Sequence, residues 1–465
     1  MRIVACLFLA VLVGCARAPI FSSPLEGPND PYMGSVDSLT KLLDGKSEAY
    51  VVFIHGVGDH CPGYAVAPTF GWLNEKAMAT MGLSALASPV VNNIPDSEFL
   101  PNHDQDPASL VSYTKRDYEY RPDAMPSGAV NVHAIEITWS QLTQWVKMNQ
   151  LDYDLTQPGD KPPSLALGCP FSPSAQYKKP PARQALNQLL KENTLDRSLV
   201  DAVIYAGVYG KAMRRGLAEA LCRAFGGEVN GGGAICRWPK PGMDKAAYFF
   251  VTHSLGSRLL YDTLVGLEGH DVANGVETFS RQEQTDAQAF LDQLILHTSS
   301  IYMMANQLPL LGLAYEEGLT SSDPPHPMLP MLRREAALQG VATPPAAFAG
   351  RSSAPTSHPQ PSVNGFIALR AQLARDSGQA FPKLTVVAFS DPNDLLSWGI
   401  PKWYQDPPDG IKPYATFTNV YLQNSTHWLG IAENPATAHT GYFVSDDVWR
   451  VIRCGGSNGH LDACP

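Results

Sequence analysis

The chain has 465 residues, a formal net charge of −10 and eight cysteines. Apolar residues make up 44% of the sequence and aromatic residues 9%, which is enough for a large core and excludes global disorder. The excess of 44 acidic over 34 basic residues, without a long basic run, argues against a nucleic-acid partner, because such a protein needs a basic face.

The N-terminal residues have the order of a secretory signal. Arg2 precedes an apolar run over residues 3–13, which is too short to span a bilayer. The motif Leu12-Val13-Gly14-Cys15 resembles the lipobox of bacterial lipoproteins, in which residues 1–14 are removed and Cys15 is lipidated. This resemblance implies a membrane-bound protein of the bacterial cell envelope, with the outer membrane favoured because Ala16 rather than Asp follows the cysteine. Cleavage after residue 18, which would give a secreted or periplasmic protein, is the alternative.

Export would give the other cysteines a structural role. Once Cys6 is removed and Cys15 is acylated, six remain: Cys61, Cys169, Cys222, Cys236, Cys454 and Cys464. An even number in an oxidising compartment predicts disulfides, and free buried thiols are the alternative. Cys222 and Cys236 flank a Gly-rich loop, and Cys454 and Cys464 flank the C-terminal tail, so we expect each pair to bond locally. Cys61 is then left with Cys169.

Apolar runs of two kinds alternate along the chain. Strands are predicted at residues 49–54, 130–139, 247–251, 384–389 and 417–422, and helical periodicity is found at 184–224, 255–267 and after Ser445. Strands that alternate with helices indicate a mostly parallel central sheet with helices on both faces. Ligands bind such sheets beyond the carboxyl ends of the strands, so functional residues are expected there. Residues 15–40 resemble a tether that is rich in Pro, Ser and Gly.

A serine follows the strand predicted at 247–251 and immediately precedes a helix. The motif Thr252-His253-Ser254-Leu255-Gly256 resembles the nucleophile elbow of α/β-hydrolases, G-x-S-x-G, in which a tight turn projects the serine above the sheet. Thr252 replaces the first glycine of that pattern, which implies slightly different packing. The resemblance makes Ser254 the nucleophile, and His253 occupies a position that is usually structural. A serine that merely caps the helix is the alternative.

A second motif, His55-Gly56-Val57-Gly58-Asp59-His60, follows the strand at 49–54. It resembles the oxyanion loop of the same family, where the backbone N–H groups of Val57 and Leu255 would bind the oxyanion. A rival interpretation is a zinc site, because His55, Asp59 and His60 partly match the motif of metallo-β-lactamase-like hydrolases. Val57 occupies the middle ligand position and cannot bind metal. We therefore expect neither a metal nor another cofactor.

In the α/β-hydrolases the triad residues follow one another in the order serine, acid, histidine, so the acid and the histidine are expected after Ser254, in the C-terminal third of the chain. Asp391 and Asp394 both follow the strand at 384–389; Asp391 fits a turn, and Asp394 is the favoured triad acid. His439 lies just before the last helix, as the catalytic histidine of the family does, and His427 is the less favoured base.

The resemblance rests on four motifs between residues 49 and 443. It implies one α/β-hydrolase domain over residues 41–465, with large insertions at about 65–240 and 319–363. The implied activity is hydrolysis of small-molecule or lipid carboxylic esters through an acyl-enzyme, as in esterases and lipases, with Ser254, His439 and Asp394 as the triad. A non-catalytic outer-membrane lipoprotein that uses the hydrolase fold as a binding module is the alternative.

Overall fold

The computed structural model describes residues 19–22, 34–69, 71–94, 111–121, 128–150, 198–207, 209–230, 235–237, 245–265, 281–312, 363–378, 381–400, 415–424, 435–457 and 460–464, with four single positions between 184 and 195. The predicted signal peptide, Cys15, Cys169 and His427 lie outside the described residues. Within the described residues, no helix combines the length and the apolar character that crossing a membrane requires.

The centre of the molecule is a ten-stranded mixed sheet. Six neighbouring strands are parallel, in the spatial order β6 (Val130–Thr138), β2 (Glu48–Ile54), β9 (Ala246–His253), β10 (Thr298–Met304), β11 (Leu384–Ser390) and β12 (Ala415–Tyr421). The remaining strands are antiparallel to their neighbours: β1 (Ile20–Ser22) pairs with β12, while β5 (Val111–Tyr120), β3 (Leu83–Ala85) and β4 (Val90–Ile94) extend the sheet beyond β6. The predicted α/β class with a mostly parallel sheet is confirmed.

The central parallel strands are largely apolar because both faces of the sheet are covered. Every residue of β9 is buried. Alternate side chains enter two different cores: Phe250 packs on one face with Ile54, and Phe249 packs on the other with Phe53.

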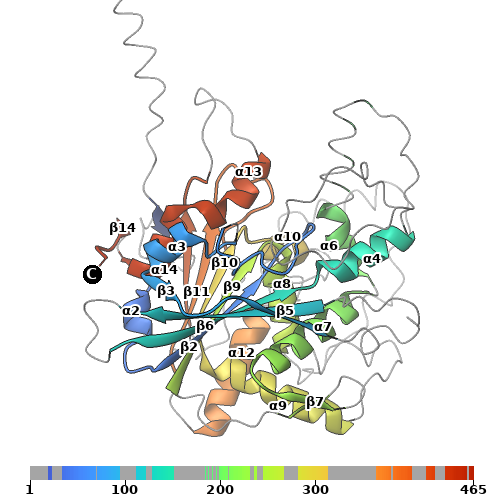
Figure 1. Cartoon of the computed structure of the whole chain (residues 1–465), viewed down its shortest axis with the longest axis horizontal. Helices are drawn as coiled ribbons and strands as arrows, with labels where there is room; N and C mark the ends of the chain where they lie inside the picture. The colour runs from blue at the N-terminus through green and yellow to red at the C-terminus, as the bar shows by residue number, and fades with distance from the viewer. Residues whose placement is uncertain are drawn as a thin grey trace, which may run out of the picture.

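Helices cover the two faces unequally (Figure 1). The first core is completed by α4 (Ser140–Gln150), α6 (Val200–Ala206), α7 (Tyr209–Ala224), α8 (Leu255–Val265), α9 (Arg281–His297), α10 (Leu308–Gly312) and α12 (Val363–Ser377). The second core is completed by α2 (Leu39–Leu42), α3 (Glu75–Met81), α14 (Asp446–Cys454) and the 3-10 helix η8 (Gly441–Val444). The short helix α13 (Pro435–Thr440) precedes η8.

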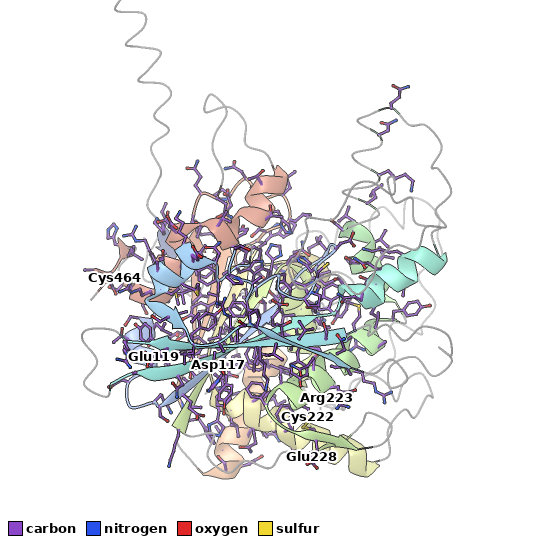
Figure 2. All side chains as sticks on the ribbon, viewed as in Figure 1. Asp117, Glu119, Cys222, Arg223, Glu228 and Cys464 are labelled. Carbon is purple, nitrogen blue, oxygen red and sulfur yellow. A yellow bond between two sulfur atoms is a disulfide. The ribbon has the colours of Figure 1, made fainter. Side chains whose placement is uncertain are left out.

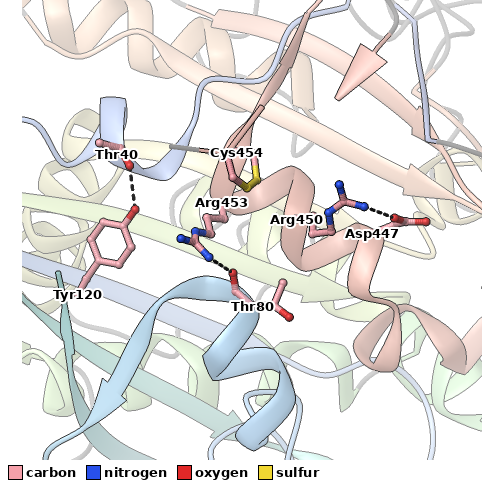
Figure 3. Close-up of a disulfide and its surroundings, with 8 residues drawn as sticks. Thr40, Thr80, Tyr120, Asp447, Arg450, Arg453 and Cys454 are labelled. Atoms are coloured by element: carbon pink, nitrogen blue, oxygen red, sulfur yellow. Dashed lines mark hydrogen bonds and ion pairs between the residues drawn. A yellow bond between two sulfur atoms is a disulfide. The ribbon is translucent and has the colours of Figure 1, made fainter. Parts of the chain in front are cut away.

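The C-terminal helix α14 is fastened to α3. Near the end of the helix, beside Cys454, Arg453 donates a hydrogen bond to the backbone oxygen of Thr80 at 2.8 Å (Figure 3). Ser445 occupies the predicted N-cap position, but its side chain makes no capping hydrogen bond. The two aspartates that follow it still place negative charge at the positive end of the helix.

The range 65–240, predicted as an insertion, also contributes to the central sheet. Its strand β6 pairs with β2 from Asn131 opposite Glu48 to Ile137 opposite Ile54. The long helical stretch predicted at 184–224 is divided at Gly207, between α6 and α7. The sheet therefore continues into a part of the chain where no family motif is found.

Two of the predicted disulfides lie within the described residues. Cys222 and Cys236 have Cα atoms 5.8 Å apart and join α7 to β8 (Ile235–Arg237), which pairs with β7 (Glu228–Asn230). Cys454 and Cys464 enclose the hairpin of β13 (Gly456–Ser457) and β14 (His460–Leu461). Figure 2 shows Cys222 among the lower helices and Cys464 at the left edge of the molecule. Cys61 is disulfide-bonded as well, and Cys169, its predicted partner, lies outside the described residues.

Candidate active site

The register of the parallel strands brings the predicted functional segments to one edge. His253 at the end of β9 lies opposite Met304 of β10, which lies opposite Phe389 of β11. Ile54 at the end of β2 lies opposite Thr252. The strands that follow β2 in the parallel sheet, β6 and β9, pair on its opposite sides, so β2 and β9 border a topological switch point. Such a point is where α/β sheets bind ligands.

Ser254 lies in a strained turn between β9 and α8. It is the only residue between the strand and the helix, and its φ angle is +53°. A left-handed conformation costs about 1–2 kcal/mol in a residue other than glycine. Ser254 and Ala305, which follow adjacent strands, are the two described non-glycine residues with positive φ. The turn is held by a hydrogen bond of 2.9 Å from the Ser254 N–H to the Met304 oxygen. This strand, strained serine and helix have the geometry of a nucleophile elbow.

Two glycines let the loop after β2 pack directly on this turn. A Cβ atom at Gly56 would lie 2.5 Å from the Cβ of Ser254, and one at Gly256 would lie 2.5 Å from the backbone oxygen of His55. Thr252, which replaces the first glycine of the family pattern, is buried with its hydroxyl 2.7 Å from that of Ser257. The structure therefore accommodates the threonine through a side-chain hydrogen bond.

Asp394 and His439 form a buried pair. The Nδ1 atom of His439 lies 2.9 and 3.0 Å from the two carboxylate oxygens of Asp394. Because a carboxylate only accepts hydrogen bonds, Nδ1 carries the proton and Nε2 is the basic nitrogen. Asp394 also accepts hydrogen bonds from the Tyr442 hydroxyl at 3.0 Å and the Leu396 N–H at 2.9 Å. This arrangement has the geometry of the acid and base of a triad.

Asp391, the competing candidate, holds loops together instead. Its carboxylate accepts backbone N–H groups from Asn393 at 2.9 Å and Asn424 at 2.6 Å. The first contact is the side-chain bond typical of a turn. Of the two aspartates, Asp394 is therefore the one that contacts His439.

His253 connects the serine turn to the histidine. Its Nε2 atom donates a hydrogen bond to the backbone oxygen of His439 at 2.9 Å, and the two imidazole rings have centroids 4.9 Å apart. Burial, with a smaller electrostatic contribution from the nearby His439, lowers the pKa of His253 well below its ordinary value, so the ring is neutral at pH 7. Ser254 Oγ and His439 Nε2 are both buried without a hydrogen-bond partner among the described residues. The bond between serine and histidine is thus not formed in this structure; catalytic hydrogen bonds of this kind often tighten only when substrate binds.

The His55 side chain is committed to holding its own loop. Its Nδ1 atom lies 2.8 Å from the Gly56 oxygen, and its Nε2 atom accepts the Trp139 N–H at 3.1 Å. Burial lowers the pKa of His55 well below its ordinary value and that of His60 to about 4. Both nitrogens of His55 are occupied, so this ring is not free to bind a metal, and the alternative zinc site loses a ligand. No cluster of three potential metal ligands is found within the described ranges.

The backbone N–H groups expected to bind an oxyanion are available. Within the described part of the chain, neither the Val57 N–H nor the Leu255 N–H has a hydrogen-bond acceptor. The neighbouring Gly58 N–H instead donates to Asp201 at 2.7 Å. The sequence motifs did not single out Asp201, which reaches the loop from α6, or Tyr442, which lies three residues after His439 in η8.

Comparisons of the chain with protein-family models, with curated proteins and with solved structures find no match.

Proposed function

We propose that this protein is a serine hydrolase that cleaves carboxylic esters through an acyl-enzyme. The observation that carries the proposal is the buried hydrogen bond between Asp394 and His439, whose backbone is joined through His253 to the turn of Ser254. This bond leaves the basic nitrogen of His439 available on the same edge of the sheet as the serine. The choice of an ester as substrate rests on the resemblance to α/β-hydrolases.

In the proposed mechanism, the Ser254 hydroxyl attacks the ester carbonyl while His439 Nε2 takes its proton. Asp394 stabilises the resulting imidazolium. The N–H groups of Val57 and Leu255 bind the negative oxygen, and each such donor contributes about 3 kcal/mol in comparable enzymes. The tetrahedral intermediate then expels the alcohol, which receives the proton from His439. Water attacks the acyl-enzyme by the same steps and releases the carboxylic acid.

Labelling with a fluorophosphonate probe tests the proposal. The intact protein should be labelled covalently, and Ser254→Ala should not be labelled. Ser257→Ala is a matched control, because this buried serine lies one helical turn away with its hydroxyl beside Thr252. Failure of the intact protein to react would refute the serine mechanism. A series of p-nitrophenyl esters of increasing acyl length would then define the substrate.

We also propose that the protein is exported and anchored by a lipid on Cys15. The disulfides Cys222–Cys236 and Cys454–Cys464 support an oxidising compartment. Metabolic labelling with a radioactive fatty acid should mark the intact protein in bacteria and should not mark Cys15→Ala. Equal labelling of both would place the lipid elsewhere.

A further inference from the structure

A buried ion pair reaches the predicted oxyanion loop from two helices outside the sheet. Lys147 of α4 lies 2.7 Å from Asp201 of α6, and both side chains are completely buried. The other carboxylate oxygen of Asp201 accepts the Gly58 N–H at 2.7 Å. Neither charged residue belongs to the proposed triad.

Stability alone is a poor explanation for this pair. Removing two charges from water costs about as much as their attraction returns, so apolar residues of similar volume often replace a buried pair without loss. Burial raises the pKa of Asp201 to about 6, even though Lys147 and the Gly58 N–H both favour the charged form. What the ion pair does specifically is to hold the backbone N–H of Gly58 in one position.

The loop that receives this hydrogen bond is held at both ends. At its start, Gly56 packs on Ser254. At its end, the Ser140 hydroxyl of α4 accepts the His60 N–H at 3.0 Å and donates to the His60 oxygen. Gly58 lies between these points with a φ angle of +105°, a conformation that glycine adopts readily and that gives the loop no rigidity of its own.

Fixing Gly58 also determines the direction of the preceding peptide. The Gly58 N–H belongs to the peptide group that begins at the Val57 carbonyl, and Val57 has only two soft dihedral angles. Because Gly56 packs on Ser254 and the Gly58 N–H is bonded to Asp201, the Val57 N–H between them has little freedom to rotate. We infer that Asp201, itself held by Lys147, is a positioning residue that fixes the Gly58 amide and thereby aims the Val57 N–H at the oxyanion. This inference rests on the proposed hydrolase function.

Two double variants separate positioning from packing. Lys147→Met with Asp201→Asn removes both charges and keeps a carbonyl oxygen for the Gly58 N–H. Lys147→Met with Asp201→Leu removes the charges and the acceptor at similar volume. The measurements are kcat and KM for p-nitrophenyl ester hydrolysis, together with the thermal unfolding temperature.

We expect the Leu variant to lose about 10²-fold in kcat with KM unchanged, because one oxyanion donor is misdirected. We expect the Asn variant to keep kcat within about tenfold of the wild type, a loss far smaller than that of a misdirected donor. Equal kcat values for the two variants would overturn the inference, as would a Leu variant as active as the wild type. If the wild-type protein showed no ester hydrolysis that depends on Ser254, the proposed function itself would be overturned. This result differs from an active wild type whose two variants have equal kcat, which would overturn only the positioning role of Asp201.

A third variant covers the case in which the Leu protein does not fold. Asp201→Glu keeps the charge beside Lys147 but moves the carboxylate by one methylene relative to Gly58. A loss of about tenfold or more in kcat at unchanged KM would support positioning, because small misplacements of catalytic groups are costly. Unchanged kcat would overturn the inference.

Discussion

Replacing Gly56 by alanine should separate the two segments that form the site. The added Cβ would lie 2.5 Å from the Ser254 Cβ and 2.8 Å from the His253 oxygen, against at least 3.4 Å for an ordinary contact. The loop and the turn would therefore have to move apart by about 0.9 Å. A displacement of this size costs about 10²-fold in rate when it affects catalytic groups. Overpacking of this kind also destabilises a protein by about 1–3 kcal/mol.

The rate of fluorophosphonate labelling measures the first effect and urea unfolding the second. Gly207→Ala is the control, since its Cβ would meet its nearest neighbours at 3.4 and 3.5 Å and its φ angle of −91° suits alanine. We expect Gly207→Ala to be labelled at the wild-type rate. If Gly56→Ala were labelled equally fast and unfolded at the same urea concentration, the direct contact between loop and serine turn would be refuted.

Three other predictions follow from the buried polar groups and the disulfides. Asp394→Asn should lower kcat by about 10⁴-fold because the amide favours the wrong imidazole tautomer. Asp391→Asn should lower kcat less, and the opposite order in ester hydrolysis would assign the triad acid to Asp391. Replacing both Cys222 and Cys236 by alanine should reduce the free energy of unfolding by about 3 kcal/mol, because the bond closes a loop across 14 positions. An unchanged urea midpoint would contradict this. Burial raises the pKa of Glu136 from its ordinary value of 4.5 to about 7. Between pH 4.5 and pH 7, Glu136 is therefore protonated in the folded state and ionised in the unfolded state. Its contribution to stability is fully present below about pH 4.5 and falls by roughly 3 kcal/mol as pH rises to about 7. Urea unfolding at pH 5 and pH 8 should show this decrease in the wild type and not in Glu136→Gln; an equal decrease in both would exclude Glu136 as its source.

The local parts of the site were predictable because they depend on neighbours in the sequence. Residues 49–54 and 384–389 are apolar enough to be strands buried on both faces, and both are found. The turn at Ser254 was identifiable because a strand, a serine and an amphipathic helix follow one another directly. The two local disulfides were predictable for the same reason, since each closes a short loop.

The local pattern favoured Asp394 over Asp391 as the triad acid but did not show which of the two contacts a histidine. Both follow β11 within four residues. What distinguishes the two aspartates is His439, which lies on α13, 45 residues from Asp394 in the sequence. Its imidazole is hydrogen-bonded to Asp394 and not to Asp391. For a similar reason, no motif within residues 65–240 indicated that β6 would pair with β2. A strand such as β6 enters a central sheet by pairing with a distant strand, which no local motif announces.

By itself, the sequence determined the α/β class and the strand ends at which chemistry is expected, because both follow from short-range periodicity and turn geometry. Only the tertiary structure decided which side chains meet. It joined Asp394 to His439, set His253 against the histidine backbone and brought Asp201 to Gly58 from a separate helix. Hydrogen bonds between distant segments depend on atomic positions that packing alone establishes, and so they leave no periodic signal in the chain.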